Sequence, residues 1–194
     1  MKKNYWLQLI EDSGCHAQKM VETLSVYSRL TTHRPPDSQF TLTKPLKQAL
    51  TNLNDNIKST SAIIEIRGNW PKYTGCEEQW LMYFSYVIHI ALLYQKNDVE
   101  HIPNITIQCI QVEKMLRISI EDNGIGVKEN LLDIITIPFK RMQSDKDFPG
   151  IGMGLSYCEH IAELHGGELK IGLSSQGGLA VIYAEKLLRK SCLN

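Results

Sequence analysis

Apolar side chains recur at helical spacing in some stretches of the chain and alternate at strand spacing in others. In residues 5–30 the apolar positions fall three or four residues apart with polar residues between them, which predicts one long amphipathic helix. Further helices are predicted from Thr43 onward, over 77–95 and over 155–165. Short apolar runs bounded by turn residues predict strands over 62–66, 105–110, 116–120, 168–173 and 179–184.

The order of these elements predicts an α+β protein. Strands and helices do not alternate strictly, so a purely parallel sheet is disfavoured, and the alternation of Arg117-Ile118-Ser119-Ile120 suits an antiparallel strand with one covered face. We expect a two-layer sandwich of a mixed β-sheet and helices, preceded by an N-terminal helical arm. Pro35 and Pro36 stop the first helix, and 34–38 is the candidate linker. The predicted division is an arm at 1–36, a domain at 37–188 and a tail at 189–194.

Composition and charge narrow the class of protein. The 194 residues include 21 basic and 21 acidic side chains, and this balance disfavours a broad attraction to nucleic acid or to an anionic membrane. No run approaches the roughly 20 apolar residues that a membrane-spanning helix needs, and the first residues do not resemble a secretory signal. The five cysteines are scattered, which predicts reduced thiols in the cytoplasm. We therefore expect no nucleic-acid and no membrane partner.

A first glycine motif, Asp122-Asn123-Gly124-Ile125-Gly126, follows a predicted strand. Its glycines let the backbone turn sharply and come close to a ligand, because no Cβ stands in the way. A carboxylate at Asp122 could accept a hydrogen bond from an exocyclic amine such as that of adenine. A hairpin turn is the alternative, since Asn-Gly is a common turn signal. The motif alone leaves both interpretations open.

A second glycine motif, Gly150-Ile151-Gly152-Met153-Gly154-Leu155, opens a predicted helix. Free backbone N–H groups at a helix N-terminus favour phosphate. The motif differs from the phosphate loop GxxxxGK[ST], and no strand immediately precedes it as a dinucleotide fold requires. The alternative interpretation is a flexible glycine hinge.

Taken together, the two motifs resemble the glycine boxes of the ATP-binding domain of sensor histidine kinases, in the GHKL class of ATPases. Pro138-Phe139-Lys140-Arg141 is similar to the phenylalanine box of the family's ATP lid, and 161–167 is similar to the stretch after the second glycine box. Residues 20–30 resemble the second helix of the dimerisation and phosphotransfer hairpin. The resemblance covers nearly the whole chain and implies the histidine kinase-like ATPase fold.

The resemblance also implies a set of nucleotide-binding residues. Asp122 would bind the adenine amine in a pocket shaped by the first glycine box, and the second glycine box would hold the phosphates. Lys140 or Arg141 would neutralise phosphate charge, although a solvated basic pair remains the alternative. The implied residues are Tyr94, Asp122, Gly124, Gly126, Lys140, Arg141, Gly150, Gly152, Gly154 and Leu155.

The sequence departs from the family in the asparagine box, where a pattern like NLxxNAxKY supplies the Mg²⁺ ligand. Here Ile90 stands at the position of the metal-binding asparagine, Tyr86 at the earlier asparagine and Leu93 at the lysine. A hydrocarbon side chain offers no oxygen to a hard cation, so we expect the Mg²⁺ site to be lost. His89 is one residue along the helix, and we interpret it as a packed or surface histidine. No residue is assigned to catalysis or to a metal.

The phosphoacceptor histidine box is also missing. His16 lacks the acidic residue and the nearby proline of the family's pattern, so it is interpreted as an exposed helix histidine. Three hypotheses follow: a competent ATP-binding module, a degenerate module that acts by protein contact, and a phosphotransfer adaptor that uses His16. Because Ile90 replaces the metal-binding asparagine and the histidine box is missing, the sequence favours a module that is weak or inactive in phosphoryl transfer, and the His16 adaptor ranks third. A response regulator or a histidine kinase is the expected partner, with a homodimer or a docked chain held by the first helix.

Overall fold

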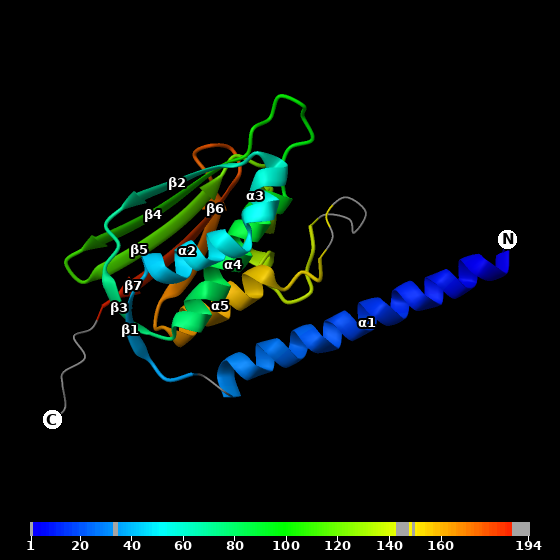
Figure 1. Ribbon diagram of the computed structural model, residues 1–194, viewed down its shortest axis with the longest axis horizontal. Coiled ribbons are helices and arrows are strands. Elements are labelled where there is room, and N and C mark those ends of the chain that lie inside the picture. Colours follow the sequence, from blue (N-terminus) through cyan, green and yellow to red (C-terminus); the bar gives the residue numbers. More distant parts are fainter. Residues whose placement is uncertain (1, 33–34, 143–147, 149, 188–194) are drawn as a thin grey trace.

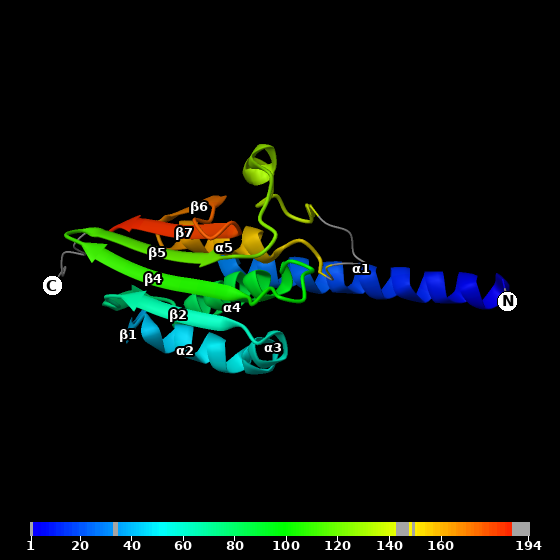
Figure 2. The same cartoon turned by 90° about the horizontal axis from the view of Figure 1, so that it is seen from above.

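The computed structural model describes residues 2–32, 35–142, 148 and 150–187, in a long helix and a two-layer domain (Figure 1). Helix α1 (Lys2–Thr32) continues through Gly14, and its N-terminal half projects away from the domain (Figure 2). Arg34 of the predicted linker and the predicted tail at 189–194 lie outside the described residues. The domain boundaries therefore stay predictions. None of the described helices combines the length and the apolar character needed to cross a membrane.

The domain is built on a five-stranded sheet in the order β2-β4-β5-β7-β6. Strand β2 pairs with β4 in parallel, whereas the other three pairings are antiparallel. The predicted mixed sheet and α+β class are thus confirmed. The strands are β2 (Ile63–Gly68), β4 (Asn104–Val112), β5 (Met115–Asp122), β6 (Glu168–Leu173) and β7 (Leu179–Lys186).

Helices form the second layer of the domain (Figure 1). Helix α4 packs between α2 and α5 and contacts β5, so it is the central helix of this layer. The helices are α2 (Thr43–Asn52), α3 (Asn54–Thr60), α4 (Glu77–Leu93) and α5 (Gly154–Leu164). The single helix expected from Thr43 divides at Leu53, among asparagine and aspartate residues that compete with helical hydrogen bonds.

Two short strands and one short helix were not predicted. Strands β1 (Ser38–Thr41) and β3 (Lys72–Gly75) form a separate two-stranded sheet in which buried Phe40 pairs with buried Tyr73. The 3-10 helix η1 (Glu129–Ile134) lies between the two glycine motifs, where no helix or strand was predicted. Each strand has four residues, and their stability comes from pairing with each other, so a local pattern could not reveal them.

The core is centred on α4 and the inner face of the sheet. The α4 side chains of Trp80, Tyr83, Phe84 and Ile88 are fully buried, which agrees with the apolar residues on most faces of this helix. A polar cluster fixes the end of the sheet where β7 finishes: the hydroxyls of Tyr73 and Tyr183 donate to Oε2 of Glu185 at 2.9 and 2.7 Å. Glu185 pairs with Leu116 near the start of β5, so this cluster lies at the opposite end of β5 from Asp122.

Candidate functional site

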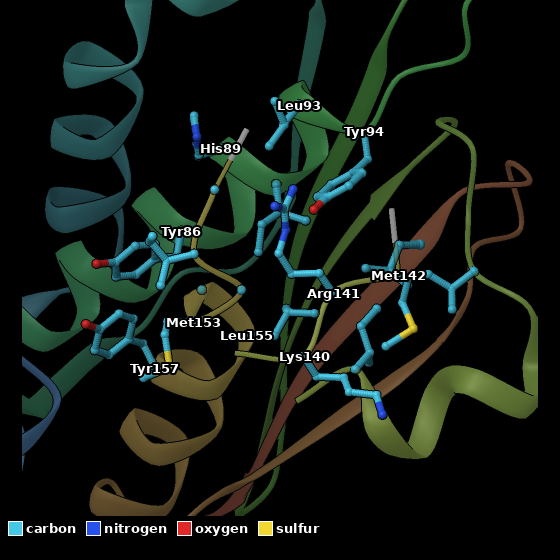
Figure 3. Close-up of a pocket in the computed structure, with 18 of the residues that line it drawn as sticks. Tyr86, His89, Leu93, Tyr94, Lys140, Arg141, Met142, Met153, Leu155 and Tyr157 are labelled. Carbon is cyan, nitrogen blue, oxygen red and sulfur yellow. The ribbon is translucent and has the colours of Figure 1, made fainter. Parts of the chain in front are cut away.

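The two glycine motifs and the end of α4 enclose one pocket of about 300 Å³ (Figure 3). Such a volume is at the lower end of the range for small-molecule sites. All of the implied ligand-binding residues line this pocket except Gly124, which lies directly behind it: Tyr94, Asp122, Gly126, Lys140, Arg141, Gly150, Gly152, Gly154 and Leu155. Segments 28 residues apart in the sequence, from Asp122 to Gly150, are thus brought to one cavity.

Asp122 ends β5 and is only 6% exposed. Its Oδ1 accepts hydrogen bonds from the backbone N–H of Gly124 at 2.9 Å and of Leu179 at 3.2 Å. Burial raises the pKa of the carboxyl group, while these two N–H groups and the positive charge of Lys96 act in the opposite direction. Both bonds end on Oδ1 and Asp122 lines the pocket, so Oδ2 can accept a hydrogen bond from a ligand.

The hairpin-turn interpretation of the first glycine motif is wrong, because β5 is followed by η1 instead of a partner strand. The motif instead packs against the end of α4. A Cβ on Gly124 would stand 2.3 Å from the carbonyl oxygen of Tyr94, which accepts from the N–H of Ile125 at 3.0 Å. Asn123 holds the loop before β4, since its side chain accepts from the N–H of Asn104 at 2.8 Å. Position 124 therefore requires glycine, because the backbone of Tyr94 lies too close to admit a Cβ.

The second glycine motif packs against the stretch that resembles the phenylalanine box. Gly152 has a left-handed φ of 77°, and its carbonyl accepts from the N–H of Phe139 at 3.0 Å. A Cβ on Gly152 would stand 2.7 Å from Cγ of Arg141. Helix α5 begins at Gly154 with no side-chain hydrogen bond at its N-cap, Met153. The first-turn N–H groups are therefore suited to an anion at this side of the pocket.

The two basic residues next to this motif lie differently. Arg141 extends into the pocket beside Tyr94, whereas the amino group of Lys140 points away from it (Figure 3). Nη2 of Arg141 donates to the carbonyl oxygen of Phe148, whose ring stacks on Tyr94 with centroids 4.8 Å apart. Lys140 is exposed, as a solvated basic residue would be. Of the pair, Arg141 is the better placed to meet a phosphate.

Hydrocarbon covers the place where the resemblance puts the metal ligand. Cδ1 of Ile90 lies 2.9 Å from the position that a Cβ on Gly154 would take, and Cδ1 of Tyr86 lies 3.7 Å from it. His89 is exposed at the rim of the pocket. Among the described residues, no group of three or more His, Cys, Asp or Glu side chains could hold a metal ion. These side chains do not fit a protein-bound Mg²⁺, which requires oxygen ligands.

Several residues in or beside the pocket were not predicted from the sequence. A Cβ on Gly178 would stand 2.0 Å from Oδ1 of Asp122, so the 174–178 turn lies directly behind the carboxylate. The adjacent pair Gly177-Gly178 is typical of a turn, and two adjacent glycines are also a signal of close approach. Lys96 acts on Asp122 through its charge. Nothing in the sequence pointed to Thr23 of α1, which also lines the pocket.

The fold and the pocket define a class of protein: an ATPase domain of the GHKL type, with a mixed sheet behind a helical layer and a glycine-bounded pocket. Residues 86–188 match the family described as histidine kinase-, DNA gyrase B-, and HSP90-like ATPase. This match covers just over half of the chain. The chain belongs to this family, and its ATP-binding domain is of the sensor histidine kinase kind.

Two similar proteins support this assignment. The chain is 30% identical over 161 residues to cyanobacterial phytochrome A of Nostoc sp., covering 83% of this chain and 20% of that protein. It is 32% identical over 158 residues to sporulation kinase C of Bacillus subtilis, covering 77% of this chain and 33% of the kinase. The chain therefore spans between a fifth and a third of the length of these relatives.

Solved structures share the fold. The mycobacterial sensor histidine kinase MprB superposes with a TM-score of 0.65 at 16% identity, covering 76% of this chain and 95% of that one. Full-length ShkA in complex with AMPPNP superposes with a TM-score of 0.71 at 16% identity, covering 96% of this chain and 39% of that one. The likeness to ShkA extends over α1 as well as the domain, since so little of this chain is left out.

Proposed function

We propose that the chain is the ATP-binding module of a two-component histidine kinase-like protein. The observation that carries this proposal is the buried carboxylate of Asp122, held by two backbone N–H groups at one end of a pocket whose other end is the start of α5. An acceptor for an exocyclic amine and a set of N–H donors for an anion are what an adenine nucleotide requires. The ShkA structure, which shares this fold, holds AMPPNP.

We further propose that metal-assisted phosphoryl transfer is weak in this chain. Ile90 presents hydrocarbon to the start of α5, so the protein supplies no oxygen ligand at that place. Without a metal to neutralise charge on the phosphates, transfer loses a major electrostatic contribution. The second candidate is a degenerate regulatory or phosphotransfer adaptor that works by protein contact. His16 is exposed on α1, and a response regulator or a histidine kinase is the partner in either case.

A titration with ATP, in Mg²⁺ and then in EDTA, tests the proposal. We expect binding with affinities that agree within about twofold, because the protein holds no metal ligand. Ile90→Asn should make binding tighter in Mg²⁺ than in EDTA, since an amide oxygen is introduced, whereas Ile90→Leu keeps the hydrocarbon and should show no metal dependence. Strong metal dependence of ATP binding, or autophosphorylation, in the unchanged chain would contradict weak transfer and support the hypothesis of a competent kinase module. If the chain does not bind ATP at millimolar concentration, the ATP-binding module is excluded and the adaptor remains as the candidate function.

The arm provides the proposed surface for a second copy of the chain. Four of the exposed apolar residues of α1 stand in two pairs, each with an interval of three, and the small Gly14 and Ala17 continue the spacing of three or four between the pairs. A helix cannot bury such a stripe alone, and this spacing suits a partner helix. The four residues are Leu7, Ile10, Val21 and Leu24.

We therefore predict that the chain sediments as a dimer at micromolar concentration. Leu24→Glu places a charge within the stripe and should shift the chain to the monomer, because burying an unpaired carboxylate is costly. Gln8→Glu is the matched control, since Gln8 is exposed on α1 outside the stripe. Sedimentation velocity measures the oligomeric state of the unchanged chain and the two variants. If the unchanged chain is a monomer, the proposed homodimer is wrong.

A further inference from the structure

Helix α1 forms part of the wall of the nucleotide-type pocket. Thr23, in the C-terminal half of α1, lines the same cavity as Asp122 and Gly152. The contact is made by the face of α1 opposite the exposed stripe, where Val26, Tyr27 and Leu30 pack against the domain. The last turns of the helix are therefore both a part of the pocket and a part of the core.

An unbroken chain of packed side chains joins the pocket floor to α1. It begins at Ile90 and Tyr86 of α4, which lie against Gly154. The ring of Tyr86 stacks on that of Tyr157 of α5, with centroids 4.9 Å apart and planes 14° apart. Tyr157 in turn contacts Tyr27 of α1 at a centroid distance of 5.9 Å. The last two steps are contacts between large aromatic rings in a close-packed interior, so a shift of one ring must be accommodated by its neighbour.

Two hydrogen bonds and a second ring contact fix α1 in this position. The hydroxyl of Tyr157, which is only 2% exposed, donates to the carbonyl oxygen of Thr23 at 2.6 Å. Burial raises the pKa of this hydroxyl, so it keeps its proton as a donor. Tyr27 also stacks on His160 at 5.0 Å, and Nε2 of Gln79 donates to the carbonyl oxygen of Leu30 at 3.4 Å.

We propose that nucleotide binding and the docking of α1 stabilise each other, with Tyr157 as the positioning residue between them. The inference rests on the proposed function, because it requires a ligand in this pocket. The sign follows from the geometry: the cavity is present while α1 is docked, and Thr23 bounds it without filling it. If α1 left, the pocket would lose that wall, and the stacked rings of Tyr86 and Tyr157 would be opened to water.

Linkage of this kind is reciprocal. If docking raises the affinity for ATP by a given factor, ATP raises the docking equilibrium by the same factor. Because only one wall of the pocket comes from α1, we expect a factor of about five, at the low end of the range for coupled sites.

The experiment compares ATP affinity and amide hydrogen exchange in the whole chain. Tyr27→Ala should weaken ATP binding about fivefold, whereas Tyr27→Phe keeps the ring contacts and should bind within about twofold of the unchanged chain. Tyr157→Phe removes only the hydroxyl that donates to Thr23, so it should weaken binding without leaving a cavity. Ser25→Ala is the matched control on the exposed side of α1. In the unchanged chain, ATP should slow exchange across residues 20–30.

Each outcome decides the proposal. Unchanged affinity in both Tyr27→Ala and Tyr157→Phe would show that the sites are not linked, and tighter binding would show that α1 obstructs the pocket. Either result overturns the inference while leaving the proposed function intact. No ATP binding by the unchanged chain would remove both together. In a double-mutant cycle, the effects of Tyr27→Ala and Tyr157→Phe should be less than additive, because both act on one contact.

Discussion

Replacing Asp122 with asparagine should lower the affinity for ATP by about 100-fold and change the stability of the domain little. The amide oxygen can keep accepting from the N–H groups of Gly124 and Leu179, which now bond to Oδ1. The other side-chain atom becomes an NH₂ donor that would face the exocyclic amine of adenine. A hydrogen bond to a charged group contributes about 1.5–3 kcal/mol, so its loss corresponds to a factor between roughly 10 and 100. Repulsion between two donors favours the upper value.

Two further variants separate the effect on binding from the effect on folding. Asp122→Ala removes the acceptor altogether and leaves two buried N–H groups unsatisfied, at a cost of about 1–3 kcal/mol each, so it should also lower the melting temperature. Asp55→Asn makes the same chemical change at an exposed site on α3 and should bind ATP normally. If Asp122→Asn binds ATP as tightly as the unchanged chain, this carboxylate does not recognise the base.

Much of the domain could be predicted because its elements have strong local patterns. Helix α4 and strands β4 and β5 are long, and their apolar residues follow the periods of 3.6 and 2 that burial on one or more faces requires. Strands β1 and β3 have no such signal. Each contributes one buried ring, Phe40 or Tyr73, to a contact that exists only after the chain has folded.

The pocket was predictable only where its residues are neighbours in sequence. The backbone N–H of Gly124 donates a hydrogen bond to Asp122, only two residues earlier, so the geometry of this motif follows from its local sequence. Gly178 and Leu179 reach Asp122 because β5 pairs with β7, with Glu121 opposite Ala180, and register of that kind is a tertiary property. The contact of Ile90 with Gly154 likewise needs α4 and α5 to pack.

A single methyl group behind the carboxylate should be as harmful as the loss of the carboxylate itself. In Gly178→Ala the new Cβ would stand 2.0 Å from Oδ1 and 2.4 Å from the backbone oxygen of Asp122, well inside any real contact distance. Either the 174–178 turn or Asp122 must move, and the bond from the N–H of Leu179 is then lost. Overpacking costs about 1–3 kcal/mol and a buried hydrogen bond about 1 kcal/mol, so we expect a loss of about 3 kcal/mol in the free energy of unfolding.

Gly172→Ala is the matched control, because Gly172 lies in β6 of the same sheet and has nothing within 4 Å of the position of a Cβ. It should be neutral or slightly stabilising, since alanine has less freedom in the unfolded chain than glycine. Denaturant unfolding and an ATP titration of both variants distinguish two effects. A stable Gly178→Ala protein that has lost ATP binding would show that Asp122 moved and the turn stayed. A stable protein that still binds ATP would show that the turn yields, and that the two N–H bonds to Asp122 do not hold the carboxylate for the ligand.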